Sequence, residues 1–532
     1  MKKLLAILLA CTMLFASAAV AGAEAEKVIR VGMGYDPTTL DFAEANLDSA
    51  NLILEHTAEA LIKSKGNGQY VPGIAESWTK SEDSRVWTFK LREGLVYADG
   101  TTPITAEDIY YNVKRLLDPA VGHGNASFVL ANSLEYYEGK VAFEEVGIKV
   151  IDDLTIEYTF VNPAYESSFT GLGLTGAMEQ SFVEAAGQSF GASLETYLPY
   201  GPYMVSEWVM DSSIVLVKNP YYYDQTVATL DKIEIKVGAT GDVAVDMMLG
   251  GELDVASFTN PNYIQTVADA GFEKKLDHLD SYQGLNINLA GKTEETGKFI
   301  SNVNFRKALN LAINRDALTM SVRQGEVPAS RLTHSSEMAY AANPDYVAYP
   351  TTGDVELAKE YLNKALEELG CTIDELPTFE LMCYEAQGSI NTLAVYQDMW
   401  LQALGVKTEI AALTIQVMIS NAMSGNFDFW LGGNAPSVPD ACESYLMGYT
   451  TANFSPLRGY SDAAYDELYN KTVSSATLEE RLANYAAVEQ YFCDNVLALI
   501  TTWTVSDLYA PADVQGIYMT DGGVMNVGSV TR

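Results

Sequence analysis

The chain has 532 residues, of which 48% are hydrophobic, so it can form roughly two to four domains with packed cores. Lysine and arginine number 33 against 70 aspartates and glutamates, and the formal net charge at pH 7 is −37. A surface this acidic repels nucleic acids and anionic membranes, and we therefore expect no nucleic-acid partner. We interpret the charge as a solvated surface that favours solubility.

The first 23 residues have the pattern of a secretory signal peptide. A basic start at residues 2–3 precedes a mainly apolar run at 4–19 and a small-residue cleavage signal, AGA, at 21–23. In a second interpretation, residues 8–11 form the lipobox of a bacterial lipoprotein, whose Cys11 would carry a lipid anchor. No later apolar run approaches the ~20 residues of a membrane-spanning helix. Both interpretations predict an exported protein.

Besides Cys11, the chain contains Cys371, Cys383, Cys442 and Cys493. An exported protein can form disulfides, and the sequence leaves every pairing of these cysteines open. No CxxC motif and no cluster of cysteine and histidine has the spacing of a zinc site, so we expect no structural metal.

Residues 86–117 combine two strand signals with a helix start. Apolar and polar residues alternate over 86–91, which predicts a half-buried strand, and turn residues bracket a second short strand at 95–98. Thr105 and Asp108 then resemble a capping box, with the Thr105 hydroxyl accepting from the backbone at Asp108, at the start of a helix over 106–117. These residues predict scaffold and contain no catalytic pair.

Strand and helix patterns alternate along the rest of the chain, which is typical of an α/β protein with mixed sheets. No internal repeat or low-complexity linker separates them, so we expect interleaved lobes. The predicted strands are 214–217, 233–237 and 406–410, and the predicted helices are 305–313, 393–404 and 478–492, the last capped by Thr477.

A succession of short motifs extends over essentially the whole chain after the signal peptide. They are DPTTLD at 36–41, PGIAESW at 72–78, LREG at 91–94, LLDP at 116–119, GPY at 201–203, NPYY at 219–222, LDKI at 230–233, GELDV at 251–255, FRKALNLAI at 305–313 and GYSDAAYD at 459–466. In this order they resemble extracellular solute-binding protein family 5, the peptide- and nickel-binding subunits of ABC importers.

The resemblance implies an α/β fold of the class II (cluster C) periplasmic-binding-protein type, a two-lobed clamshell with mixed sheets and an inserted third domain. It also implies a monomer that is not an enzyme, needs no cofactor, and delivers its solute to permease and ATPase subunits at the periplasmic or extracellular face of the cytoplasmic membrane. The expected boundaries are 1–23 for the signal peptide, 24–65, 199–278 and 498–532 for lobe I, 66–198 for the inserted domain and 279–497 for lobe II.

An enzyme is the alternative from another class, because GQSFG at 187–191 fits the GxSxG motif of hydrolases. That motif needs a strand before its serine and a helix after it, whereas residues 181–186 predict a helix. The histidines lack the HExxH spacing of zinc hydrolases, although a carrier of chelated nickel stays possible. We therefore disfavour a secreted hydrolase. The histidines are His56, His123, His278 and His334.

The resemblance also implies where a ligand would be held, by positions that match the family's binding segments. Lobe I, the inserted domain, the crossover and lobe II each contribute. The expected ligand-binding residues are Asn46, Leu47, Asn125, Tyr282, Trp430, Gly433, Asn434, Ala435 and Ser437.

Two departures from the family pattern bear on the ligand. The family's segment usually reads WGWGADYPDP, and its acidic residue receives the ligand's α-ammonium in peptide binders; here residues 432–441 read GGNAPSVPDA, with Ser437 at that place. Dipeptide binders have an arginine where this chain has QGSIN at 387–391. Because a buried ammonium without a counter-charge is costly, a zwitterionic dipeptide is disfavoured. We expect a longer peptide held through its backbone, or alternatively a neutral oligosaccharide.

We expect the mature protein to begin at Glu24 and to carry no lipid, because the apolar run continues past Cys11. Intact-mass spectrometry of the exported protein measures this directly. Cys11→Ser serves as a control and should leave the mature mass unchanged. A mass matching a chain that starts at a diacylated Cys11 would instead establish the lipoprotein interpretation.

Overall fold

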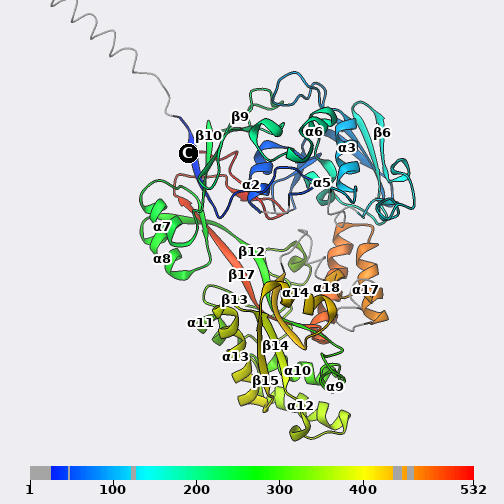
Figure 1. The fold of residues 1–532 in the computed structure, drawn as a ribbon, viewed down its shortest axis with the longest axis vertical. Coiled ribbons are helices and arrows are strands. Elements are labelled where there is room, and N and C mark those ends of the chain that lie inside the picture. Colours follow the sequence, from blue (N-terminus) through cyan, green and yellow to red (C-terminus); the bar gives the residue numbers. More distant parts are fainter. Residues whose placement is uncertain (1–25, 46–47, 67, 122–127, 435–445, 452–460) are drawn as a thin grey trace, which may run out of the picture.

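The computed structural model describes residues 26–45, 48–66, 68–121, 128–434, 446–451 and 461–532. Figure 1 shows two bodies, here called the upper body and the lower body, joined by two long strands, β12 (Phe272–Ile287) and β17 (Ala498–Pro511). The upper body contains the N-terminal half of the chain and its C-terminal segment, and the lower body contains most of the residues between the two strands.

Two four-stranded sheets form the frame of the upper body. One is mixed, in the order β1-β10-β9-β8, with β1 parallel to β10. The other is antiparallel, in the order β4-β5-β7-β6. The strands are β1 (Val28–Met33), β4 (Ala75–Lys80), β5 (Val86–Leu91), β6 (Ile148–Asp152), β7 (Thr155–Thr159), β8 (Tyr203–Val209), β9 (Ser213–Lys218) and β10 (Lys232–Val237), with two short pairs, β2 (Ile62–Ser64) with β3 (Tyr70–Pro72) and β18 (Tyr518–Met519) with β19 (Met525–Asn526).

Helices cover these sheets, and a small separate core forms where two of them meet β11 (Ala256–Phe258). The helices are α2 (Asp48–Thr57), α3 (Ala106–Leu116), α4 (Ser133–Tyr137), α5 (Leu172–Thr175), α6 (Gln180–Ala186), α7 (Gly241–Leu249) and α8 (Pro261–Asp269).

One seven-stranded sheet, in the order β11-β17-β12-β16-β14-β15 with β13 paired to β17, begins at β11 in the upper body and continues as the frame of the lower body. The remaining strands are β13 (Val327–Pro328), β14 (Phe379–Tyr384), β15 (Thr408–Leu413) and β16 (Phe429–Asn434). The helices are α9 (Glu294–Ile300), α10 (Val303–Leu311), α11 (Arg315–Ser321), α12 (Val355–Leu369), α13 (Gln387–Leu404), α14 (Ile415–Ser424), α17 (Ala463–Val473) and α18 (Leu478–Asp494).

Local sequence patterns account for most of these elements. In β5, Trp87, Phe89 and Leu91 are buried while the residues between them are not, as the alternation predicts. The strands predicted at 214–217 and 233–237 lie within β9 and β10, and the helices predicted in the lower body are α10, α13 and α18. The strand predicted at 406–410 is β15, which starts two residues later, at Thr408.

Of two local predictions around α3, one is wrong and one is confirmed. Residues 95–98 do not form a strand; only Val96 makes a single bridge, to Pro103. The predicted capping box between Thr105 and Asp108 is present at the start of α3. In it, the Asp108 carboxylate accepts from both the backbone N–H and the hydroxyl of Thr105, at 2.7 and 3.1 Å.

β12 and β17 pair with each other along most of their length as they pass from one body to the other. On β12, Leu276 packs against the upper core and Leu279 is buried in the lower core. On β17, Trp503 belongs to the lower core and Leu508 to the upper core. The pairing shifts register twice within residues 274–281, and such bulges bend a strand pair locally. The crossing point therefore coincides with irregular pairing.

The bodies also touch away from these strands. The Tyr165 hydroxyl of the upper body donates to the Ser475 carbonyl between α17 and α18, at 2.6 Å. The Arg481 guanidinium lies 4.9 Å from the centre of the Tyr165 ring. This contact fixes a second point at which one body meets the other.

The C-terminal segment completes the upper core. Val527 and Val530 are fully buried, and the Val527 N–H donates to Nε2 of His56 on α2 at 3.1 Å. Arg532 donates to the Asp254 carboxylate at 2.8 Å. The C-terminal segment thus shares one hydrophobic core with residues from the N-terminal part of the described chain.

Cys371, Cys383 and Cys493 carry free thiols, and the expected signal peptide and Cys442 lie outside the described residues. Within the described ranges, no helix combines the length and apolar character needed to cross a bilayer. The same ranges hold no group of three or more His, Cys, Asp or Glu side chains arranged to bind a metal ion.

The buried ion pair between Arg331 and Glu489 provides a test of the lower core. Both side chains are at most 3% exposed, and Glu489 also accepts the Thr333 N–H at 2.7 Å. Glu489→Ala leaves the guanidinium buried without its counter-charge, so we expect a loss of about 3–5 kcal/mol in the free energy of unfolding, measured by urea denaturation. Glu356→Ala, which breaks an exposed pair with Lys359, is the control and should change little.

Candidate functional site

The expected ligand-binding residues that the structure describes lie on two neighbouring strands of the lower sheet. Tyr282 on β12 is opposite Asn434 on β16, and Gln283 is opposite Gly433. Trp430 lies further along β16, opposite Asn286. The structure therefore brings Tyr282, Gly433 and Asn434 together at one end of β16, beside the crossing strands.

β16 is paired along its whole length on one side only. β12 pairs with every residue from Phe429 to Asn434, whereas β14 pairs with only Phe429 and Trp430. Among the described strands none pairs with the second edge of residues 431–434. Gly433 is exposed, and a Cβ there would come within 2.4 Å of the Gln283 side chain. This end of β16 therefore presents backbone groups beside a position that has no side chain.

Trp430 has a polar group that the described residues leave unused. Its indole ring packs against a small cluster that includes Met418 and Phe427. Its buried Nε1–H has no hydrogen-bond partner within the described part of the chain. Since buried donors are nearly always satisfied, this N–H is available to a ligand or to water.

Tyr282 is held by the lower body. Its side chain is buried, and its hydroxyl donates to the carboxyl group of Glu337, whose second oxygen accepts the His334 N–H at 2.8 Å. Burial raises the pKa of Glu337 to about 7. The Tyr282 ring thus anchors β12, and its role toward a ligand stays a prediction.

Asn46, Leu47, Asn125, Ala435 and Ser437 lie outside the described residues, so their roles also stay predictions. At the start of α13, where dipeptide binders have an arginine, the Gln387 amide donates to Asn391 at 2.8 Å.

A cavity of about 620 Å³ in the upper body was not predicted from the sequence. It is lined by α2, β2, the segment 168–174 and the turn between β18 and β19. Ala45, which precedes the expected ligand residues Asn46 and Leu47, is part of its wall. Ser168, also in the wall, lies three residues after Tyr165, which contacts the lower body. The cavity is therefore next to the border between the bodies.

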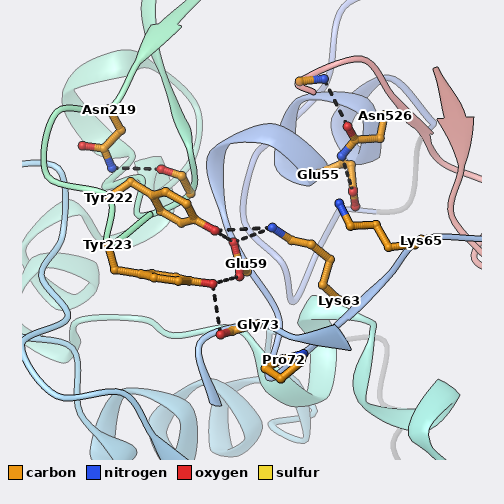
Figure 2. Close-up of polar contacts among 12 residues, drawn as sticks. Glu55, Glu59, Lys63, Lys65, Pro72, Gly73, Asn219, Tyr222, Tyr223 and Asn526 are labelled. Atoms are coloured by element: carbon orange, nitrogen blue, oxygen red, sulfur yellow. Dashed lines mark hydrogen bonds and ion pairs between the residues drawn. The ribbon is translucent and has the colours of Figure 1, made fainter. Parts of the chain in front are cut away.

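One end of this cavity is polar, and Figure 2 shows how its charges are arranged. Glu59 is only 3% exposed; its carboxylate accepts from Lys63 Nζ at 2.9 Å, from the Tyr223 hydroxyl at 2.6 Å and from the Tyr222 hydroxyl. Both Glu59 oxygens are occupied, and the Lys63 charge is neutralised locally.

Glu55, four residues earlier and within α2, has different surroundings. The Asn526 amide donates to one of its carboxylate oxygens at 2.8 Å, and no described cation forms an ion pair with it. Lys65 instead faces Tyr518, with Nζ 5.1 Å from the centre of the ring. Burial raises the pKa of Glu55 to about 7, against the opposing effects of Asn526, Lys63 and Lys65. Glu55 is thus a buried carboxyl group that forms no direct ion pair with a described residue, although the charges of Lys63 and Lys65 act on it.

The sequence alone contains a pattern that marks Glu55 and Glu59 as candidates for a structural or functional role. Both are acidic residues within the mainly apolar stretch from Leu52 to Ile62, and an acid that is buried in such a stretch is either paired or functional. The sequence does not show which, because their partners come from segments far away along the chain.

Comparison with known proteins identifies the chain. The family model described as bacterial extracellular solute-binding proteins, family 5 Middle, matches residues 69–456. The chain belongs to this family. It is therefore a solute-binding protein and not an enzyme, and the resemblance predicted from the short motifs is confirmed.

Curated relatives agree. The chain is 27% identical over 443 residues to the periplasmic oligopeptide-binding protein OppA of Salmonella typhimurium, covering 81% of this chain and 79% of the relative. It is 25% identical over 474 residues to the dipeptide-binding protein DppE of Bacillus subtilis, covering 86% and 83%.

A solved structure of the murein tripeptide-binding protein MppA, in an unliganded open form, superposes with a TM-score of 0.77 at 21% identity, covering 96% of this chain and 98% of MppA. This confirms the predicted two-lobed α/β fold with mixed sheets. Ser189 of the GxSxG match follows the helix α6 where a hydrolase needs a strand, so the hydrolase alternative is rejected.

Glu55 predicts a pH dependence of stability. Its carboxyl titrates near 4.5 in an unfolded chain and near 7 in the fold, so the folded state keeps a proton that the unfolded state has lost. Its effect is absent below pH 4.5, and it destabilises the fold progressively as pH rises to about 7. Glu55→Gln removes this destabilisation. At about pH 8, urea denaturation should therefore show a free energy of unfolding that is on the order of 1–3 kcal/mol higher than in the wild type, and this difference should vanish at pH 4.5.

The matched control is Glu93→Gln, an exposed glutamate, which should leave the pH profile of stability unchanged. Glu337 titrates in the same range but is present in both variants, so its contribution cancels. A Glu55→Gln variant less stable than the wild type at pH 8 would show that neighbouring groups compensate the charge.

Proposed function

We propose that this protein is the exported peptide-binding subunit of an ABC importer. It captures peptides between its two bodies and delivers them, as a monomer, to permease and ATPase subunits at the outer face of the cytoplasmic membrane. The proposal extends family membership, which makes the chain a solute-binding protein, to a class of solute and a transport partner. Relatives named for oligopeptides, dipeptides and murein peptides support it.

The observation that carries the proposal is the one-sided pairing of β16. An extended peptide can add to an unpaired strand edge through main-chain hydrogen bonds, with side chains entering pockets to either side. Residues 431–434 offer such an edge, and exposed Gly433 leaves it open. The Trp430 indole N–H, which has no hydrogen-bond partner among the described residues, lies on the same strand.

The expected domain division fits this mechanism and is retained as part of the proposal. Lobe I and the inserted domain (24–278 and 498–532) would close against lobe II (279–497). The bulged pairing within 274–281 is the natural place for that rotation, because a few residues with irregular pairing can absorb changes in backbone angle.

The ligand is proposed to be longer than a dipeptide. Ser437 stands where peptide binders have an acid, and residues 387–391 supply no cation for a dipeptide carboxylate. Binding through backbone groups of β16 does not need these charges.

We therefore expect peptides of about four to eight residues to raise the melting temperature of the purified protein, and free dipeptides to have little effect. A thermal-shift screen with matched concentrations of both sets measures this.

Small-angle scattering with a confirmed ligand should show a smaller radius of gyration, as closure requires.

Neutral oligosaccharides and chelated nickel are the comparison arms of the screen. Stabilisation by either of them with none by any peptide would overturn the proposal. Tight dipeptide binding would keep the peptide class and refute the length preference.

A further inference from the structure

The cavity of the upper body combines a long apolar wall with one polar end. Its apolar lining includes Phe42, Leu54, Leu116, Leu172, Leu174 and Val524, and its polar end is formed by Glu55, Glu59 and Lys63. Its volume of about 620 Å³ lies within the range of small-molecule sites, so it can hold at least one long side chain of a ligand.

The charges at the polar end are unequally satisfied. Glu59 and Lys63 neutralise each other at 2.9 Å, and two tyrosine hydroxyls complete the Glu59 carboxylate. Lys65 does not line the cavity and faces the Tyr518 ring. Glu55 lines the cavity and has only the neutral Asn526 amide as a hydrogen-bond donor. Among the described charged groups that line this end, Glu55 is therefore the one that makes no ion pair, although Lys63 and Lys65 lie near enough to lower its pKa.

A carboxyl group without an ion pair in a largely apolar cavity reduces stability. Burial raises the pKa of Glu55, and Asn526, Lys63 and Lys65 offset only part of that rise. A bound cation would supply the missing counter-charge. This distinguishes Glu55 from Glu59, whose partners are all in the chain.

We propose that this cavity receives a positively charged group of the peptide ligand, with the Glu55 carboxylate as its counter-charge. Lysine and arginine side chains fit the cavity because their apolar stems can lie along the leucine-lined wall while the charged head reaches the polar end. The α-ammonium of the ligand is the other source of the same charge.

This inference rests on the proposed peptide-binding function and adds its specificity. In the lower body, Ser437 carries no charge and cannot bind a positive group. We assign that role to Glu55 in the upper body. A cationic group held there also selects against acidic peptides, whose carboxylates would face Glu55 and Glu59.

Isothermal titration calorimetry with a set of alanine-based hexapeptides tests the inference. Each peptide carries one lysine, at a different position, and each has two partners: one with norleucine in place of lysine and one with an acetylated N-terminus. In the wild-type protein, removing the bound charge should weaken affinity on the order of tenfold or more, the usual worth of a hydrogen bond to a charged group.

The peptide that loses affinity shows which of its groups supplies the bound positive charge. Sensitivity to norleucine at one position assigns a side chain, and sensitivity to acetylation assigns the α-ammonium. In Glu55→Gln the same change should have little effect, since its counter-charge is gone. Glu93→Gln, exposed and outside the cavity, should behave as the wild type.

The outcomes separate this inference from the proposed function. Peptides that bind equally well with and without the charge, or that lose affinity equally in Glu55→Gln and the wild type, overturn the inference and leave peptide binding intact. An absence of binding by every peptide overturns the proposed function and the inference together. A preference for an acidic or norleucine-containing peptide overturns the inference alone.

Discussion

The structure depends on two strands that belong to two cores at once. β12 and β17 pair with each other, and each carries residues that pack in the upper core and residues that are buried in the lower core. Because their backbone groups satisfy one another, they can cross between the bodies without leaving unpaired polar groups. The central pairing of the lower sheet, including Tyr282 opposite Asn434, continues from this crossing. The candidate ligand edge is thus attached directly to the connection between the bodies.

The distribution of buried charge divides scaffold from candidate site. In the lower body, Arg331 and Glu489 neutralise each other, and the buried Arg315 donates to the carbonyl of Ile500 at 3.0 Å. In the upper body, Arg115 pairs with Asp41 at 2.7 Å. These groups have their partners within the chain and hold segments in place. Glu55 differs from these groups because it lines a cavity and, among the described residues, has a neutral amide as its hydrogen-bond donor and no ion-pair partner.

Local patterns predicted individual elements where the deciding contacts are local. The alternation in β5, the amphipathic face of α10 and the Thr477 cap of α18, which accepts the Glu480 N–H at 3.2 Å, all depend on residues a few positions apart. Residues 95–98 were mispredicted because distant and turn contacts decide them: the Ala98 N–H donates to Pro199, and Asp99 accepts the N–H groups of Thr101 and Thr102. The overall fold was predicted from the resemblance of the short motifs to the family. The cavity could not be foreseen, because Glu55 and its partner Asn526 are 471 residues apart.

The packing of the C-terminal segment makes the upper body depend on contacts that are distant in sequence. Val527 and Val530 fill the upper core beside α2, and Arg532 contacts Asp254, which also binds Arg30 on β1. Val527 and its partner His56 on α2 are 471 residues apart in the sequence. A truncation that removes this segment would therefore open the upper core at a helix encoded near the other end of the described chain.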